Sequence, residues 1–507
     1  MFFSVFTLGC KLNQLESEAI ADSFRLEGFE LIPWDRLRSK SKESFKPLLM
    51  LVNTCTVTSM AEQKARRIIR KALNEHPGAC LIVTGCYAQM DKDALSALEE
   101  GRRLFVIPGG MKDRLLDLPR FLVQAFPTEE LSSKLQGEVS GIQDMPGLIA
   151  SWLASSYSLA RCSDVIDGTF RFCPEEFSSH SRAFLKIQDG CDHHCSYCRV
   201  SLARGTSRSL SAKNVLAQLL SLEQRGFAEA VLTGVNIFQY RDSGLFPGQT
   251  SELKSAQNYS LGLPGLLSFL LNETGKIRLR LSSIELENEL HKDLEDFINV
   301  IANNRIRSHF HLSMQSGSAK ILAKMGRQYG PEDIERAAAS LRLARGDPFL
   351  ACDIIAGFPG ETERDFEDTL KLCEKIGFAW IHAFPFSPRP GTAASGFPEK
   401  VSEKDKARRV RLLTELAKKG RLDYIHRWQG KEVEAVVEAG GDLEGSHKPP
   451  GVGTSNLVKA VSENYLKLLV KCDEKPVPGS IIRCIIQPFT NGPSKNAGNF
   501  DALAERI

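Results

Sequence analysis

Short apolar runs that each end in small or polar residues recur between residues 183 and 395, separated by helix-like stretches. This alternation is typical of parallel strands joined by helices, and it predicts a (βα) barrel or partial barrel. In such a barrel the carboxyl ends of the strands form one face, where one site can take side chains from several strands. The runs lie at residues 183–188, 230–234, 277–282, 309–315, 349–355 and 380–386.

Three cysteines follow the first of these runs with the spacing C-x3-C-x2-C; we call Cys191, Cys195 and Cys198 the loop cysteines. A 4Fe-4S cube normally takes four thiolates, so three closely spaced ones can hold it and leave one iron open to a ligand. A structural zinc site is the alternative, but zinc sites usually pair C-x2-C units or combine Cys with His. His193 and His194 lie inside the loop at poor spacing for such a site. The spacing therefore favours an iron–sulfur cluster.

Residues 1–125 alternate short apolar runs with charged, helix-like stretches, which predicts an open α/β sheet of the Rossmann or flavodoxin type. Cys10, Cys55 and Cys86, which we call the edge cysteines, each come just past such a run. Because ligand sites gather at the carboxyl ends of parallel strands, we expect these thiols to meet at one edge and form a second three-cysteine metal site. A single free cysteine is usually buried and inert, and Cys80, which precedes its run, is predicted to be so.

The composition limits the classes of protein to which the chain can belong. An apolar fraction of 42% and a charged fraction of 25% are those of an ordinary globular protein. A net charge of +3 gives no argument for a nucleic-acid partner, which would need local basic faces. No apolar run approaches the ~18 residues of a membrane span, and the first residues lack a basic leader. Thirteen cysteines without such a leader indicate reduced thiols that serve metals, so we predict a cytoplasmic protein with no membrane partner.

The C-terminal part has a different periodicity. Residues 403–431 are helix-like and basic, with ten Lys or Arg against four Asp or Glu. Short runs with a period of two follow at 432–438, 465–471 and 480–486, separated by Gly and Pro turns. They predict a small β-barrel of the kind that binds oligonucleotides, beside a helix that supplies phosphate contacts. A barrel with a structural or dimerisation role is the alternative.

Other segments carry weaker signals. Residues 126–180 are rich in Ser and are predicted to be a linker or insertion, in which Cys162 and Cys173 are incidental. The polar loop at 240–261 is longer than a barrel turn needs and is predicted to be a surface insertion. The basic helix predicted at 61–71 is either a solvated face or a contact for an anionic partner.

The sequence therefore predicts an α/β protein of five segments. They are an N-terminal α/β domain with the second metal site (1–125), a linker or insertion (126–180), a central partial-barrel domain (181–427), a small β-barrel (428–495) and a tail (496–507).

Eight stretches carry a resemblance to a known family. They are Thr7-Leu-Gly-Cys-Lys-Leu-Asn-Gln14, Asn53-Thr-Cys-Thr-Val-Thr58, Gly85-Cys-Tyr-Ala-Gln89, Phe184-Leu-Lys-Ile-Gln-Asp-Gly-Cys191, Arg204-Gly205, Ser283-Ile-Glu285, Gln315-Ser-Gly317 and Gly357-Phe-Pro-Gly-Glu-Thr362. With them the chain resembles the radical S-adenosylmethionine (SAM) methylthiotransferases over nearly its whole length, apart from the linker and the 240–261 loop. Thr-Leu-Gly-Cys-Lys, in place of Thr-Tyr-Gly-Cys-Gln, favours the bacterial branch that acts on threonylcarbamoyl-adenosine of tRNA.

The resemblance implies two 4Fe-4S clusters and SAM as cofactors. The loop cysteines would hold the catalytic cluster, whose open iron binds SAM and supplies a 5′-deoxyadenosyl radical. The edge cysteines would hold the second cluster, suited to carrying the sulfur that is transferred. Glu285 is a candidate acceptor of a hydrogen bond from the SAM ribose. The full set of implied SAM-binding residues is Tyr197, Thr233, Gly234, Ser283, Glu285 and Gln315.

The implied reaction adds a methylthio group to carbon 2 of threonylcarbamoyl-adenosine at position 37, in the anticodon loop of tRNA. The final β-barrel resembles the RNA-binding TRAM domain of the family. The reaction also requires a sulfur source and an electron donor such as a flavodoxin or ferredoxin, which the sequence does not identify.

Several alternatives stay open. The same chemistry acts on isopentenyl-adenosine of tRNA, or on an aspartate of a ribosomal protein, in other branches. A non-catalytic iron–sulfur RNA-binding protein and a radical-SAM protein with a single cluster are the remaining ones. One stretch departs from the branch: Arg199-Val-Ser-Leu202 follows the loop cysteines where an Ile-Ile-Pro-Tyr-type run is usual. The lost proline changes the shape expected for the substrate loop.

Overall fold

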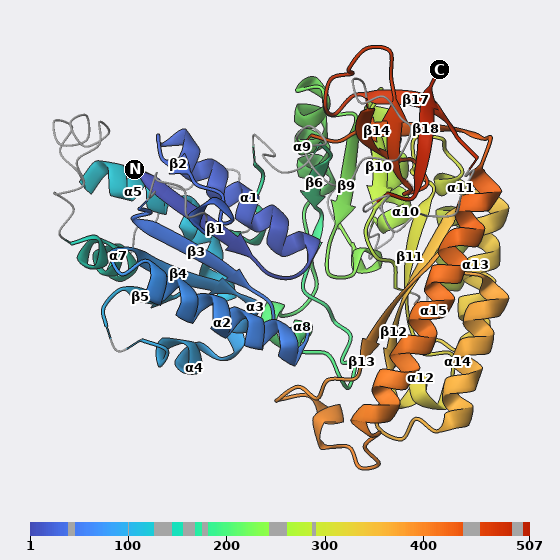
Figure 1. The fold of residues 1–507 in the computed structure, drawn as a ribbon, viewed down its shortest axis with the longest axis horizontal. Helices are drawn as coiled ribbons and strands as arrows, with labels where there is room; N and C mark the ends of the chain where they lie inside the picture. The colour runs from blue at the N-terminus through green and yellow to red at the C-terminus, as the bar shows by residue number, and fades with distance from the viewer. Residues whose placement is uncertain are drawn as a thin grey trace, which may run out of the picture. The chain divides into compact units, whose positions relative to one another are not determined.

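The computed structural model describes most of the chain, in two compact units (Figure 1). The described residues are 1–38, 46–99, 101–125, 144–155, 168–174, 181–242, 261–285, 290–439, 457–488 and 500–507. Unit 1 comprises Met1–Glu176, Asp189–His193 and Cys198–Leu210, and unit 2 comprises Phe177–Gln188, His194–Tyr197 and Ser211–Ile507. Cys162 and nearly all of the loop predicted at 240–261 lie outside the described residues.

Unit 1 contains a five-stranded parallel sheet with the strand order β2-β1-β3-β4-β5. Its strands are β1 (Phe2–Thr7), β2 (Glu30–Leu31), β3 (Leu49–Thr54), β4 (Cys80–Gly85) and β5 (Leu104–Val106). All residues of β3 and β4 are buried, as expected for central strands of a sheet covered on both faces. The order is that of flavodoxin-like folds, in which ligands bind where the strand order reverses, here between β1 and β3.

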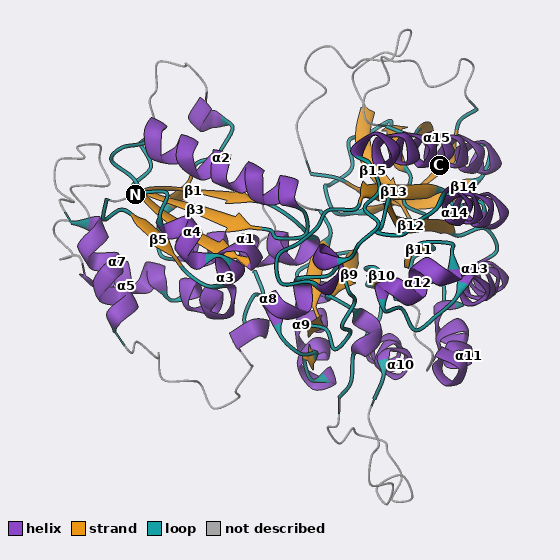
Figure 2. Ribbon diagram, turned by 90° about the horizontal axis from the view of Figure 1, so that it is seen from below, coloured by secondary structure: helices purple, strands orange, loops and turns teal. Residues whose placement is uncertain are grey.

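Helices cover both faces of this sheet (Figure 2). One face packs against α1 (Lys11–Leu26), α5 (Leu118–Ala125) and α7 (Met145–Ala154), and the other against α2 (Ser59–Glu75). Two short helices, α3 (Cys86–Met90) and α4 (Lys92–Ser96), follow β4. Helix α7 lies inside the segment predicted to be a linker, and its Trp152 is 1% exposed in the same core as β1. That segment therefore contributes to the core of unit 1.

Unit 2 contains six parallel strands in two three-stranded sheets, ordered β10-β9-β6 and β11-β12-β13. The strands are β6 (Ala183–Lys186), β9 (Glu229–Thr233), β10 (Arg278–Leu281), β11 (His309–Gln315), β12 (Phe349–Ala356) and β13 (Trp380–Pro385). Isolated parallel bridges pair Leu279 of β10 with Ile306, just before β11, and Ile284, just after β10, with Leu312 of β11. The six strands thus form the predicted partial barrel.

Helices alternate with these strands along the chain (Figure 1). They are α9 (Ala212–Gln224), α10 (Leu263–Glu273), α11 (Leu290–Ile301), α12 (Ala319–Met325), α13 (Pro331–Arg345), α14 (Glu363–Ile376) and α15 (Glu403–Trp428). Thr362 and Asp365 form a capping box that starts α14, which explains the end of the Gly-Phe-Pro-Gly-Glu-Thr motif. The basic helix predicted at 403–431 is α15.

The C-terminal strands close into a small barrel in the order β14-β15-β16-β18-β17. They are β14 (Glu432–Val437), β15 (Leu457–Ser462), β16 (Lys467–Lys471), β17 (Ile481–Ile486) and β18 (Ala502–Arg506). The barrel core is continuous with side chains from β12 and α15, among them Phe349 and Tyr424. Strand β18 lies in residues 496–507, where the sequence predicted only a tail; it pairs in parallel with β16 and closes the barrel.

The predicted fold class is confirmed: an open α/β sheet, a partial (βα) barrel and a small closed β-barrel follow one another along the chain. Among the helices that the structure describes, none combines the length and the apolar character that a membrane span requires.

Candidate active site

The edge cysteines occupy the carboxyl ends of three neighbouring strands in unit 1. Cys10 follows β1 at the start of α1, Cys55 directly follows β3, and Cys86 directly follows β4. Burial raises the pKa of the Cys55 thiol to about 11, and nearby negative charge on Cys10 and Cys86 adds to the rise. The predicted meeting of the three thiols at one sheet edge is thus present, at the point where the strand order reverses.

Two glycines allow the thiols to approach each other. Gly9 and Gly85 each precede an edge cysteine and have φ values of +108° and +101°. A Cβ atom on Gly9 would lie 2.8 Å from the Cβ of Cys55, and one on Gly85 would lie 2.3 Å from the carbonyl oxygen of Thr54. Only glycine fits either position, because a side chain there is both strained and blocked.

The donor set at this edge fits an iron–sulfur cluster. Among the described residues, no group of three Cys, His, Asp or Glu is arranged to hold a single metal ion. A cube is held differently, because each thiolate binds a separate iron and the sulfurs stand apart. Three soft thiolates are ligands that such clusters take. The assignment of the edge cysteines as ligands stays a prediction.

Asn13, part of the first motif, fixes two of the cysteine loops. Its side-chain amide donates to the carbonyl oxygens of Leu8, at 2.8 Å, and Thr54, at 3.0 Å. Asn53 donates in return to the carbonyl oxygen of Asn13 at 3.0 Å. These bonds tie the chain before Cys10 to the chain before Cys55, and they explain why asparagines accompany both cysteines.

A buried arginine lies beside the edge cysteines. The guanidinium of Arg204, at the end of α8 (Val200–Arg204), donates to both carboxylate oxygens of Asp189, at 3.0 and 3.1 Å, and to Glu16 at 3.0 Å. Burial alone would lower the pKa of Arg204, but Asp189, Cys86 and Glu16 raise it well above its ordinary value. Lys112 binds the other oxygen of Glu16 at 2.6 Å. Two cations thus balance two carboxylates next to the thiols. From the sequence alone, Arg204 is recognisable only as part of a motif.

The loop cysteines lie on a loop whose two ends belong to unit 1 and whose middle belongs to unit 2. Cys191 and Cys198 belong to unit 1 and Cys195 to unit 2. The Cys191 N–H donates to the carbonyl oxygen of Gly205 at 3.0 Å, and the Val200 N–H donates to the Cys198 sulfur at 3.4 Å. In unit 2, the Ser196 N–H donates to the carbonyl oxygen of Met325 at 3.0 Å. The three cysteines are partly exposed. Their role as ligands also stays a prediction.

Two of the predicted SAM-binding residues meet through an arginine in unit 2. Arg327 forms an ion pair with Glu285 and donates to the hydroxyl of Tyr197 at 2.5 Å. Asn236 donates to the second carboxylate oxygen of Glu285 at 3.1 Å. Burial alone would lower the pKa of Arg327, but Tyr197, Tyr329 and Cys195 raise it above its ordinary value. Arg327 and Asn236 were missed from the sequence because their partners lie far along the chain.

The other predicted SAM-binding residues lie at the ends of barrel strands. Thr233 ends β9 and Gly234 follows it, where a Cβ atom would lie 2.7 Å from the side-chain oxygen of Gln188. Ser283 lies just past β10, with its hydroxyl 3.4 Å from Nδ1 of His311. Gln315 ends β11 with φ of +66°, a strained conformation that clusters at functional sites.

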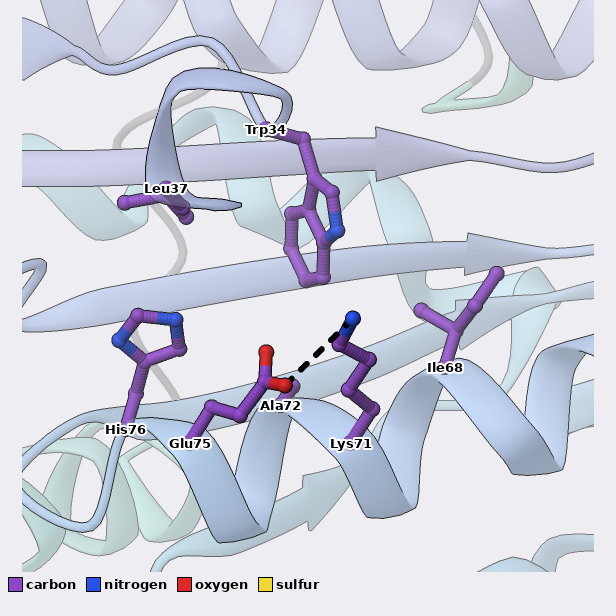
Figure 3. A pocket seen from close by; sticks show the side chains of 7 residues that line it. All are labelled: Trp34, Leu37, Ile68, Lys71, Ala72, Glu75 and His76. Atoms are coloured by element: carbon purple, nitrogen blue, oxygen red, sulfur yellow. Dashed lines mark ion pairs between the residues drawn. The ribbon is translucent and has the colours of Figure 1, made fainter. Parts of the chain in front are cut away.

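A hollow on unit 1 is too small to be the reaction site (Figure 3). Its volume is about 10 Å³, which is room for about one water. The side chains of Lys71 and Glu75, one turn apart on α2, line one side of it and form an ion pair of 3.4 Å (Figure 3). The lining residues are Trp34, Leu37, Ile68, Lys71, Ala72, Glu75 and His76.

Comparison with known proteins agrees with this arrangement. Residues 185–373 match the family model of the radical SAM superfamily, and residues 3–106 match that of the uncharacterized protein family UPF0004. The chain is 36% identical over 500 residues to a threonylcarbamoyladenosine tRNA methylthiotransferase (MtaB) of Treponema pallidum, an alignment that covers 91% of this chain and 93% of that protein. The protein of the same name from Thermotoga maritima is 32% identical, with 85% of each chain covered.

A relative with a different substrate in its name is more distant. The tRNA-2-methylthio-N(6)-dimethylallyladenosine synthase of Neorickettsia sennetsu is 29% identical, with 86% of this chain and 83% of that protein covered. These matches over most of the chain, together with the presence of both groups of cysteines, assign the chain to a family. The chain belongs to the radical-SAM methylthiotransferase family, transferases that use iron–sulfur clusters and S-adenosylmethionine.

Proposed function

We propose that this chain adds a methylthio group to carbon 2 of threonylcarbamoyl-adenosine at position 37 of tRNA. One observation carries the proposal: three thiols meet at the sheet edge of unit 1 in a chain that also has the radical-SAM cysteine loop. A second cluster site in addition to the radical-SAM cluster is what sulfur insertion requires and what a simple radical-SAM enzyme lacks. The substrate is taken from relatives at 36% and 32% identity, which carry threonylcarbamoyladenosine in their names.

The chain's own residues prepare the two sites. When bound, the clusters and SAM would supply the radical and the sulfur. Arg204 and Lys112 supply positive charge beside the edge cysteines and keep Glu16 and Asp189 paired. Arg327 holds Glu285 and Tyr197 in fixed positions, so that the predicted ribose acceptor is oriented before SAM arrives.

The RNA contacts that we propose come from three elements. The small β-barrel has the form of an oligonucleotide-binding fold. Helix α15 offers Arg411 and Lys419, which are exposed, whereas Arg409 is buried and binds Glu361 at 2.6 Å. Helix α2 exposes Arg67 and Arg70 beyond the Cys55 loop. Of α15, the basic helix predicted at 403–431, only part is thus available to RNA phosphates.

The deciding experiment examines tRNA from a strain that lacks this chain. After digestion to nucleosides, 2-methylthio-threonylcarbamoyl-adenosine should disappear and threonylcarbamoyl-adenosine should accumulate. Undiminished product would refute the substrate. Loss of the methylthiolated isopentenyl-adenosine instead would assign the chain to the branch of the Neorickettsia relative.

Complementation of the same strain with cysteine variants distinguishes the edge cysteines from cysteines that have only a structural role. Cys86→Ala should fail to restore the product, because the second cluster loses a ligand. Cys80→Ala, at the opposite end of the same strand, should restore it. Reconstituted protein with SAM and dithionite should form 5′-deoxyadenosine, which a non-catalytic iron–sulfur RNA-binding protein would not do.

A further inference from the structure

A row of aromatic side chains lies along the last strand of the partial barrel. Trp380, His382 and Phe384 alternate along β13, so they project from one face of the strand. His382 is exposed and Phe384 is 42% exposed, whereas Ile381, on the opposite face, is 4% exposed. Trp380 is half-buried and packs against the core that β12 and α15 share with the small barrel. His382 and Phe384 lie outside that core, and two exposed aromatic rings side by side on a strand require another explanation.

Two rings of this row, His382 and Phe384, are nearly parallel, whereas the ring of Trp380 lies at 76° to that of His382. The planes of His382 and Phe384 differ by 12°, with centroids 6.5 Å apart. His311, on β11, stacks on His382 at 5.1 Å with 27° between the planes. The indole Nε1 of Trp380 donates to Nδ1 of His382 at 3.3 Å, which fixes the imidazole between its neighbours. Three rings thus present nearly parallel π-faces.

The row is connected to residues predicted to bind SAM. Nδ1 of His311 lies 3.4 Å from the hydroxyl of Ser283, and its Nε2 lies 3.1 Å from a carboxylate oxygen of Asp353. Asp353 is the cross-strand partner of His382. His311 also shares β11 with Gln315, four positions further on. The aromatic row therefore lies in the same part of unit 2 as the predicted SAM site.

We propose that His311, His382 and Phe384 form a stacking platform for an unpaired purine, the adenine of the tRNA anticodon loop that is modified. This inference rests on the proposed function and names the surface that would receive its substrate. Proteins that read single-stranded RNA stack unpaired bases on aromatic and histidine rings. Asp353 and the imidazoles add hydrogen-bonding groups at the edge of the platform. An aspartate side chain, the acceptor in the ribosomal-protein branch, has no flat ring for these faces to match.

The test is a double-mutant cycle between Phe384 and the base. Reconstituted protein is titrated with an anticodon stem-loop RNA that carries threonylcarbamoyl-adenosine at position 37, and with the same RNA abasic at that position. Phe384→Leu removes the ring and keeps most of the volume, whereas Phe384→Tyr keeps the ring. Leu343→Ala, at an 88% exposed position of α13, is the surface control.

We expect Phe384→Leu to weaken binding of the intact RNA roughly 5- to 150-fold, the range for loss of one base-stacking ring. Phe384→Tyr and Leu343→Ala should bind as the wild type does. For the abasic RNA, the wild type and Phe384→Leu should bind equally, because the ring then has no base to stack on. All variants should form 5′-deoxyadenosine from SAM without RNA, which shows that the radical site is intact.

Two results would overturn the platform. One is equal binding of the intact RNA by Phe384→Leu, Phe384→Tyr and the wild type. The other is an equal loss for Phe384→Leu with intact and abasic RNA, which would show an effect independent of the base. A wild-type protein that binds neither RNA but binds a ribosomal-protein loop would refute the proposed function itself, and the platform with it.

Discussion

Glu229 is the centre of a buried ionic network that joins the partial barrel to the small β-barrel within unit 2. It is fully buried at the start of β9 and accepts hydrogen bonds of 2.7 Å from Nε of Arg280 and 2.7 Å from Nε of Arg307. Arg280 also donates to the carbonyl oxygen of Ser462 at 3.0 Å, and Arg307 to Glu434 at 2.8 Å, both in the small barrel. Glu229→Gln keeps the shape and removes the charge.

The expected cost follows from the pKa of this carboxyl. Burial alone would raise it, but Arg280 and Arg307 outweigh burial and lower the pKa from 4.5 to about 2. A shift of that size corresponds to about 3 kcal/mol of stabilisation at neutral pH. Breaking one partner of a buried ion pair typically costs about 3–5 kcal/mol, because the other charges stay buried. We therefore predict that Glu229→Gln destabilises unit 2 by about 3–4 kcal/mol.

Hydrogen exchange measured by mass spectrometry on peptides that cover β9 and β10 reports this free energy locally, without mixing in unit 1. The matched control is Glu432→Gln, because Glu432 pairs with Arg483 at the surface, where both side chains are exposed. Its expected cost is below about 1 kcal/mol. A cost of less than about 1 kcal/mol for Glu229→Gln would refute the network as the link between the two barrels.

The wild type and Glu229→Gln also give the pH dependence of this contribution to stability. The pKa of Glu229 is lower in the folded chain than in the unfolded chain, so its contribution is complete above pH 4.5 and is lost as the pH falls toward 2. The difference in stability between the wild type and Glu229→Gln should shrink from about 3 kcal/mol at pH 6 to about 1 kcal/mol at pH 3. Urea unfolding at the two pH values measures it, and a constant difference would contradict the assignment.

Three further predictions concern unit 1. Replacing all three edge cysteines with Ala should lower the iron content of reconstituted protein from about eight to about four atoms per chain, whereas Cys80→Ala should leave it unchanged; equal iron would exclude the second cluster. Arg204→Met should lower the reduction potential of that cluster, because a buried cation beside it is lost, and Arg204→Lys should restore part of the potential. A redox titration followed by electron paramagnetic resonance measures the potential of each variant. Gly85→Ala should destabilise unit 1 by at least about 3 kcal/mol in urea, because the new Cβ is both strained and blocked. Gly28→Ala should cost only about 1–2 kcal/mol, because φ is also positive there but no atom lies within 4 Å of the new Cβ.

The parts of the fold that could be predicted are those with a local signal. Continuous apolar runs marked the parallel strands, and the residue after each run placed the edge cysteines, because parallel strand ends meet at one edge. Helix α7 was missed because it lies in a Ser-rich segment and begins with Met145-Pro-Gly, which reads as a turn. Strand β18 was missed because its five residues end in Glu-Arg and are stabilised by pairing with β16 and β17, not by their own pattern.

The supporting residues of the candidate sites could not be predicted in the same way. An arginine reveals its role only through its partners, and the partners of Arg204 and Arg327 come from distant segments: Glu16 lies 188 positions from Arg204, and Tyr197 lies 130 positions from Arg327. Each motif shows that a residue is present, and the fold determines which carboxylate or thiol it meets.

Arg199 illustrates this at the one stretch that departs from the family pattern. The sequence presents that stretch as the loss of a proline after the loop cysteines. In unit 1, the Arg199 side chain is 4% exposed and its Nη1 lies 3.1 Å from Glu62 and 3.2 Å from Asp91. It also donates to the hydroxyl of Thr56, the residue after Cys55, at 3.3 Å. A buried arginine is stable in such a position only when carboxylates are buried beside it. Leaving one partner of a buried ion pair without the other costs about 3–5 kcal/mol of folding free energy. The departure thus adds a bond between the chain after Cys198 and the chain after Cys55, with partners 108 to 143 positions away that no local pattern contains.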